Sequence, residues 1–193
     1  QKKLIFTTDL KKAVSKSDII FICVGTPTKK NNNSADLKYV FNVVKQLKKN
    51  ILKYKIIVTK STVPVTTGDK IEKILIKLKN KKLVDIVSNP EFLREGDAIR
   101  DFIYPDRVII GTDSKKANKI LKNLYMPIIK KNSRYFNTSR RGAELIKYAS
   151  NAFLATKISF INELANLSEK TGVDIKDISV GMGSDQRIGD RFL

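Results

Sequence analysis

The sequence predicts an α/β fold in which a parallel sheet is followed by one long central helix. Short apolar runs alternate with segments of helical spacing from residue 18 to residue 138, and residues 139–171 then form a helical pattern without proline. Strands separated by helices are typical of parallel sheets. We therefore assign residues 1–138 to a sheet domain, and residues 139–193 to the long helix and the start of a helical domain.

Five segments are predicted to be strands because they are rich in β-branched and aromatic residues and are bounded by turn residues. They are residues 18–24, 55–59, 84–88, 107–112 and 134–138. The first is almost entirely apolar, as expected of a strand that is covered on both faces.

Helical spacing predicts helices between these strands and after the last of them. They cover residues 36–49, 67–79, 115–125, 139–171 and 175–181. Thr67 and Ser114 are predicted to cap their helices, and Gly172 to end the long one. The long helix is apolar on most of its circumference, so we expect it to be buried between domains or subunits.

Polar, turn-rich segments follow the first three predicted strands. They are residues 25–27, 61–64 and 89–91. Ligands of parallel α/β sheets bind at the carboxyl ends of the strands, so these segments are expected to line one site.

The composition is that of a soluble globular protein, with 41% hydrophobic and 30% charged residues among 193. No apolar run approaches the roughly 20 residues of a membrane span, and the first residues do not resemble a signal peptide. We expect a cytoplasmic protein without membrane contact. A net charge of +19 raises the possibility of nucleic-acid binding, but only eight of the 38 basic residues are arginines and the lysines are dispersed. A nucleic-acid partner is therefore not expected.

The chain has one cysteine and no histidine. Catalysis by Ser-His-Asp or Cys-His sets is excluded, and no metal site is expected. Cys23 falls within an apolar predicted strand, so we expect a buried, inert thiol.

Several motifs, in order, resemble the UDP-glucose/GDP-mannose dehydrogenase family. They are VGTP at 24–27, KSTVP at 60–64, SNPEFLREG at 88–96, AELIKYASNAFL at 143–154, ISFINE at 158–163 and DQRIG at 185–189. The segment FLATK at 153–157 is more similar to the UDP-glucose branch. The chain departs from the family at Thr66, where glycine is usual, and at 31–33, where the family has Asp-Gly.

The resemblance implies an incomplete Rossmann-like sheet that binds NAD. It places the family's glycine-rich loop ahead of Gln1 and its catalytic cysteine after Leu193. The first predicted strand would then lack a neighbour, and exposed strand edges promote aggregation. We therefore expect the chain to be unstable or inactive alone.

The resemblance also implies the reaction and the roles of residues. UDP-glucose would be oxidised at C6 to UDP-glucuronate in two steps, each passing a hydride to NAD. Lys147 and Asn151, four apart on one helix, would bind the sugar and the developing oxyanion. Glu91 would be the base for thioester hydrolysis. Glu95 would lie beside the nicotinamide and a bound water.

Other positions complete the implied site. Thr62 would contact NAD and order the catalytic water, and Thr26 would contact the cofactor. The implied substrate-binding residues are Glu91, Phe92, Leu93, Arg94, Glu95, Lys147, Asn151, Phe192 and Leu193. The long helix would pair in a homodimer.

Two other classes of protein remain open on the sequence. One is an inactive module that is kept for nucleotide binding or for dimerisation. A basic nucleic-acid-binding protein is the third possibility, and it predicts an affinity that falls steeply with salt.

Overall fold

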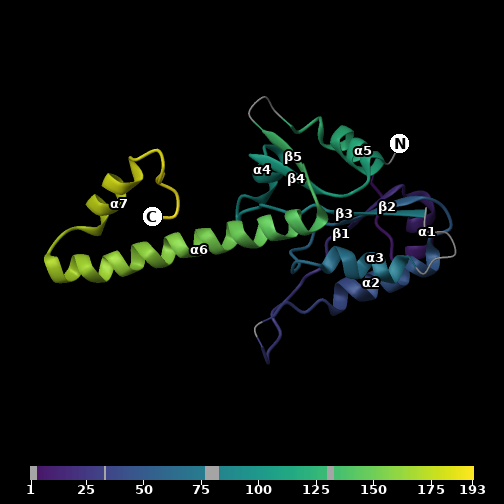
Figure 1. Ribbon diagram of the computed structural model, residues 1–193, viewed down its shortest axis with the longest axis horizontal. Helices are drawn as coiled ribbons and strands as arrows, with labels where there is room; N and C mark the ends of the chain where they lie inside the picture. The colour runs from purple at the N-terminus through teal and green to yellow at the C-terminus, as the bar shows by residue number, and fades with distance from the viewer. Residues whose placement is uncertain (1–3, 33, 77–82, 130–132) are drawn as a thin grey trace. The chain divides into compact units, whose positions relative to one another are not determined.

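The computed structural model describes residues 4–32, 34–76, 83–129 and 133–193 (Figure 1). The chain divides into two compact units, Gln1–Lys147 and Tyr148–Leu193. The α/β class is confirmed, with a five-stranded, mostly parallel sheet and one long helix. The domain boundary between residues 138 and 139 stays a prediction.

The sheet runs through the first unit in the order β1-β2-β3-β4-β5 (Figure 1). Its strands are β1 (Ile19–Ile22), β2 (Lys55–Thr59), β3 (Val84–Ser88), β4 (Arg107–Gly111) and β5 (Arg134–Thr138). Neighbouring strands pair in parallel except β3 and β4, which are antiparallel and meet at Ser88 and Gly111. The alternation of strands and helices did not predict this exception.

Helices of the first unit cover both faces of the sheet. They are α1 (Leu10–Lys16), α2 (Lys38–Asn50), α3 (Thr67–Leu75) and α5 (Lys115–Tyr125), whereas α4 (Ala98–Ile103) contributes no buried residue. Residues of α1, α2 and α3 form one apolar core with the sheet, and residues of α5 form a second. The predicted helix end at 77–79 lies outside the described residues.

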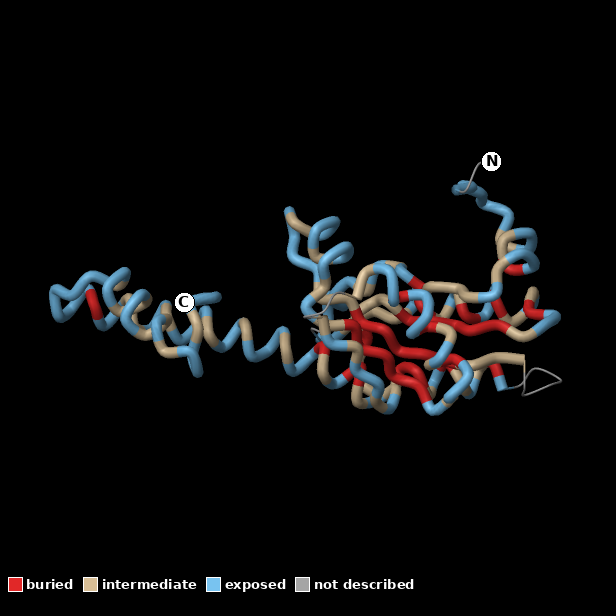
Figure 2. Tube along the Cα trace, turned by 90° about the horizontal axis from the view of Figure 1, so that it is seen from above, coloured by how far each residue is buried: buried red, intermediate tan, exposed pale blue. Residues whose placement is uncertain are grey.

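The pleat of β2 shows why a strand covered on both faces is apolar throughout. Ile57 belongs to the core under α2 and α3, whereas Ile56 and Val58 belong to the core under α5. All three are at most 1% exposed, and Figure 2 shows buried residues concentrated in the strands. Burying each such side chain contributes about 1.5–3 kcal/mol.

The two predicted helix caps had different outcomes. The Ser114 side chain accepts a hydrogen bond from the Ala117 amide at 3.1 Å, which confirms the cap of α5. The predicted Thr67 cap is wrong, because Thr67 is the first residue of α3 and Thr66 holds the N-cap position. Thr66 is left-handed, with φ of 78°, and its side chain makes no capping hydrogen bond. Glycine adopts that conformation without strain, whereas a threonine adopts it at a steric cost.

The second unit contains most of α6 (Arg140–Thr171) and α7 (Ile175–Gly183). Gly172 follows α6 with φ of 71°, as expected of a helix-ending glycine. Along α6, Phe153 is 65% exposed and Phe160 is 50% exposed. Their apolar surface is therefore not covered by the described residues of the second unit. In the part of the chain that is described, no helix is long and apolar enough to cross a membrane.

Candidate active site

The polar segments after β1, β2 and β3 meet at one edge of the sheet. The Thr26 hydroxyl donates to the Thr62 carbonyl at 2.9 Å, and the Thr62 hydroxyl donates to Glu91 Oε1 at 3.4 Å. The three strands are parallel, so their carboxyl ends lie together. The predicted convergence of these segments is confirmed.

Glu91 is the centre of the polar contacts at this edge. Its Oε1 lies 2.9 Å from Lys147 Nζ, and its Oε2 accepts a hydrogen bond from the Leu93 amide at 2.7 Å. Burial acts to raise the pKa of Glu91, but the Leu93 amide and the Lys147 ammonium outweigh it and hold the pKa below its usual range. The carboxylate is therefore ionised at neutral pH.

The partner of this carboxylate, Lys147, lies on α6 and is the last residue of the first unit. Only 6% of Lys147 is exposed. Its ammonium lies 5.2 Å from the centroid of the Phe92 ring, and the Arg107 guanidinium lies 4.1 Å from the same centroid. A buried lysine is stable when its charge is paired, and the ion pair with Glu91 meets that need.

A cavity of about 740 Å³ opens beside these residues. Its wall includes Thr26, Thr62 and Glu91, together with apolar side chains such as Phe102 and Leu124. A volume of this size is typical of small-molecule sites. The cavity belongs wholly to the first unit.

Two residues of the cavity wall were not predicted to lie there. They are Cys23 and Lys60. Cys23 was expected to be buried in its strand, but β1 ends at Ile22 and the thiol is exposed in the cavity wall. Partial burial of the thiol raises the pKa of Cys23, although the positive charge of Lys60 acts against this. Lys60 also lines the cavity, and burial lowers its pKa. Two signals were present in the sequence, because Lys60 directly follows a predicted strand and opens the KSTVP motif at 60–64.

The loop after Glu91 does not bring every predicted residue to the cavity. Arg94 forms ion pairs with Asp97 at 2.9 Å and with Asp101 at 2.6 Å. Glu95 is exposed in a turn that Gly96, with φ of 84°, completes. Leu93 lines the cavity. The roles predicted for Arg94 and Glu95 stay predictions.

The remaining predicted residues belong to the second unit. Asn151 is exposed on α6, and Phe192 is 39% exposed with φ of 68°. The segment before Phe192 is held by Lys157, whose ammonium donates to the carbonyls of Ile188 at 3.1 Å and Arg191 at 2.6 Å. The roles of Asn151, Phe192 and Leu193 stay predictions.

A mostly parallel sheet, covered on both faces and with a cavity at its strand ends, is the architecture of nucleotide-binding α/β domains. The NAD binding domain model of the UDP-glucose/GDP-mannose dehydrogenase family matches residues 1–129, and the family's central domain model matches residues 141–193. The chain belongs to the UDP-glucose/GDP-mannose dehydrogenase family.

Similar proteins include named enzymes of this family. A UDP-glucose 6-dehydrogenase of Rhizobium meliloti (strain 1021) is 49% identical over 193 residues, which are 99% of this chain and 44% of that protein. One from Pseudomonas aeruginosa is 47% identical over 195 residues, covering 99% of this chain and 43% of that protein. The chain thus spans less than half the length of these relatives.

Solved structures show the same fold. A UDP-glucose dehydrogenase from Pyrobaculum islandicum has a TM-score of 0.90 and 37% identity, covering 97% of this chain and 43% of that chain. A ternary complex of GDP-mannose dehydrogenase from Pseudomonas aeruginosa has a TM-score of 0.87 and 34% identity, covering 94% of this chain and 42% of that chain.

Proposed function

We propose that this chain is part of an enzyme that oxidises the C6 alcohol of UDP-glucose to UDP-glucuronate with NAD. The observation that carries the proposal is the Glu91–Lys147 ion pair of 2.9 Å at the carboxyl ends of parallel strands. The relatives named UDP-glucose 6-dehydrogenase, at 47–49% identity, support UDP-glucose over another sugar nucleotide.

The cavity fits the cofactor that the family implies. Its volume of about 740 Å³ lies within the range of small-molecule and cofactor sites. Thr26 and Thr62 offer hydroxyl groups at its polar side. A Cβ added at Gly25 would meet no atom within 4 Å, so the backbone there is open to a ligand. Bound NAD would supply the hydride acceptor.

The chain's own residues would divide the remaining work. The Lys147 ammonium would stabilise negative charge that develops on the C6 oxygen, with Asn151 directing the substrate hydroxyl. The Thr62 hydroxyl would order a water near Glu91, and Glu95 would hold a second water near the nicotinamide. Backbone groups of Phe92 and Leu93 would contact the sugar nucleotide, together with Arg94, Phe192 and Leu193.

The ion pair bears on how Glu91 would act. A carboxylate whose pKa is held low by an ammonium is a weak base. A substrate oxygen that takes over the Lys147 ammonium would raise the proton affinity of Glu91. The base for thioester hydrolysis would then be formed only when substrate is bound.

The proposal is tested in a chimera in which this chain replaces the matching segment of the Rhizobium meliloti relative. NADH formation from UDP-glucose is measured by absorbance. Lys147→Met and Glu91→Gln are each expected to lower the rate by about 100-fold or more. Glu169→Gln, on the exposed surface of α6, is the control and should leave the rate unchanged. A folded chimera that forms no NADH would favour the alternative, a module for nucleotide binding or dimerisation.

The exposed apolar side chains of α6 support a homodimer as the assembly. Leu145, Phe153, Phe160 and Leu167 are between 50% and 65% exposed along that helix. These side chains recur every seven or eight residues, which places them on one side of the helix, and exposed apolar surface gathered in this way marks an interaction site.

A further inference from the structure

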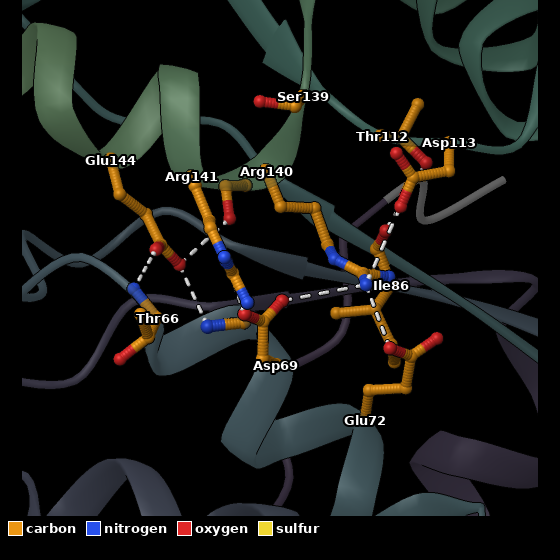
Figure 3. A network of polar contacts seen from close by, with 12 residues as sticks. Thr66, Asp69, Glu72, Ile86, Thr112, Asp113, Ser139, Arg140, Arg141 and Glu144 are labelled. Carbon is orange, nitrogen blue, oxygen red and sulfur yellow. Dashed lines mark hydrogen bonds and ion pairs between the residues drawn. The ribbon is translucent and has the colours of Figure 1, made fainter.

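Glu144 is a buried carboxylate that joins three elements of the first unit. It lies on α6 and is 3% exposed. Its oxygens accept hydrogen bonds from the Thr66 amide at 2.7 Å, the Gly68 amide at 2.7 Å and the Ser88 hydroxyl at 3.1 Å (Figure 3). The amides belong to the start of α3, and Ser88 is the last residue of β3.

The backbone at the start of α3 is shaped to receive this carboxylate. The first amides of a helix have no partner within the helix, and the Thr66 side chain does not cap α3 in the described structure. A Cβ added at Gly68 would lie 3.0 Å from Glu144 Oε1, so glycine leaves the carboxylate room. A distant residue thus supplies the cap that local sequence normally provides.

Glu144 is connected to both partners of the Glu91–Lys147 ion pair. It precedes Lys147 by three residues, close to one turn of the same helix. Ser88, which it contacts, precedes Glu91 by three residues at the end of β3. We propose that Glu144 is a positioning residue that fixes α6 against β3 so that Lys147 meets Glu91. The relevance of this role to catalysis rests on the proposed function.

The charge of Glu144 is suited to this task. An ionised carboxylate accepts hydrogen bonds from several donors, and those with a charged acceptor are the stronger ones. Burial raises the pKa of Glu144, while the Gly68 amide, the Ser88 hydroxyl and the Thr66 amide act to lower it. A glutamine at this position would present an NH₂ group toward a backbone N–H and lose at least one of these bonds.

Other contacts anchor the same end of α6 independently of Glu144. The Arg140 guanidinium lies 2.7 Å from Glu72 and 3.4 Å from Asp113 (Figure 3). Arg141 lies 2.6 Å from Asp69, with 67% of the arginine side chain exposed. These ion pairs should keep α6 attached when Glu144 is changed, and they provide a matched control.

The test is the titration of Glu91 in the chimera with the Rhizobium meliloti relative, followed by NMR of ¹³C-labelled glutamate carboxyls. Glu144→Gln is expected to move the pKa of Glu91 upward toward its ordinary value, because Lys147 no longer sits at ion-pair distance. Circular dichroism establishes that the variant is folded. A folded Glu144→Gln protein in which Glu91 titrates as in the unmodified chain would overturn the proposal.

Two further variants make the result specific. Ser88→Ala removes the 3.1 Å hydrogen bond and leaves the bonds of the Thr66 and Gly68 amides to Glu144, so Glu91 should shift in the same direction by less. If Glu144→Gln does not fold, an unchanged Glu91 titration in Ser88→Ala rejects the proposal.

Arg141→Gln should lower the unfolding temperature and leave the pKa of Glu91 unchanged. An equal shift in Arg141→Gln would show a general loosening of α6, against our proposal. None of these readouts requires turnover, so a chimera that fails to oxidise UDP-glucose leaves this test intact.

Discussion

A bidentate ion pair between Arg94 and Asp101 holds the loop after β3. The Arg94 Nε donates to Asp101 Oδ2 at 3.0 Å, and its terminal nitrogen donates to Oδ1 at 2.6 Å. The hydrogen bond from Arg94 lowers the pKa of Asp101 to about 2. A carboxylate with a lowered pKa stabilises the fold above its ordinary pKa of 3.8, and this contribution is lost as pH falls toward about 2.

Replacing Arg94 by glutamine should therefore return the pKa of Asp101 toward 3.8. The measurement is an NMR titration of ¹³C-labelled aspartate carboxyls. Arg187→Gln is the matched control, because Arg187 pairs with Asp185 in the second unit at 2.6 Å. If Asp101 still titrates near 2 without Arg94, another donor holds its charge.

Site residues were predictable where they belong to a motif. They were not predictable where the register between two strands decides which side chains become neighbours. Motifs brought Thr62, Glu91 and Lys147 into one expected site, and the structure brings these three together. The sequence did not predict that Cys23 and Lys60 would lie together at the cavity. Ile22 pairs with Thr59 across β1 and β2, so the residues that follow them become neighbours at the cavity. Sequence spacing carries no information on that register.

The Ser114 side chain makes two hydrogen bonds at the start of α5. Its oxygen accepts from the Ala117 amide at 3.1 Å and its hydroxyl donates to Asp85 at 2.6 Å. Ser114→Ala should lower the free energy of unfolding by about 1–2 kcal/mol, because a cap and a partly buried hydrogen bond are lost together. Urea unfolding measures this loss. Asn123→Ala, exposed on the same helix, should change stability by less than about 0.5 kcal/mol. Equal effects of the two substitutions would contradict the capping role.

Elements were predicted well where local signals mark both ends. The strands at 55–59, 84–88 and 134–138 have the predicted bounds. Helix α1 was missed because seven residues show little periodicity beyond Leu10 and Val14. The cap of α3 was assigned wrongly because its acceptor, Glu144, lies 76 residues after Gly68. Local sequence cannot identify a cap that tertiary structure supplies.

For the molecule as a whole, self-association should depend on the exposed apolar side of α6. Phe153→Glu is expected to weaken dimer formation by about tenfold or more, because a charge replaces a side chain that is 65% exposed in the single chain. Sedimentation velocity over a range of protein concentrations measures this change. The control is Glu169→Gln, a polar exposed position of α6. A dimer that forms equally well with Phe153→Glu would place the interface elsewhere.

The general architecture was more predictable than the direction of each strand. Alternating strands and helices predicted the sheet and its two covered faces, because apolar strands require cover on both sides. The antiparallel step from β3 to β4 was not predictable, since the intervening loop and α4 have no feature that fixes the direction of return. The helix covering residues 140–171 was predictable within one residue of its start, because it is long and uninterrupted.

The position of Cys23 has a practical consequence. It is the single thiol of the chain, it is exposed, and it forms part of the cavity wall beside Thr26 and Lys60. A thiol-reactive fluorophore would therefore label one atom of the protein, at the place where a nucleotide is proposed to enter. Since burial raises the pKa of this thiol, labelling should accelerate as the solution is made more alkaline. Occupancy of the cavity then becomes an optical signal that needs no catalytic turnover.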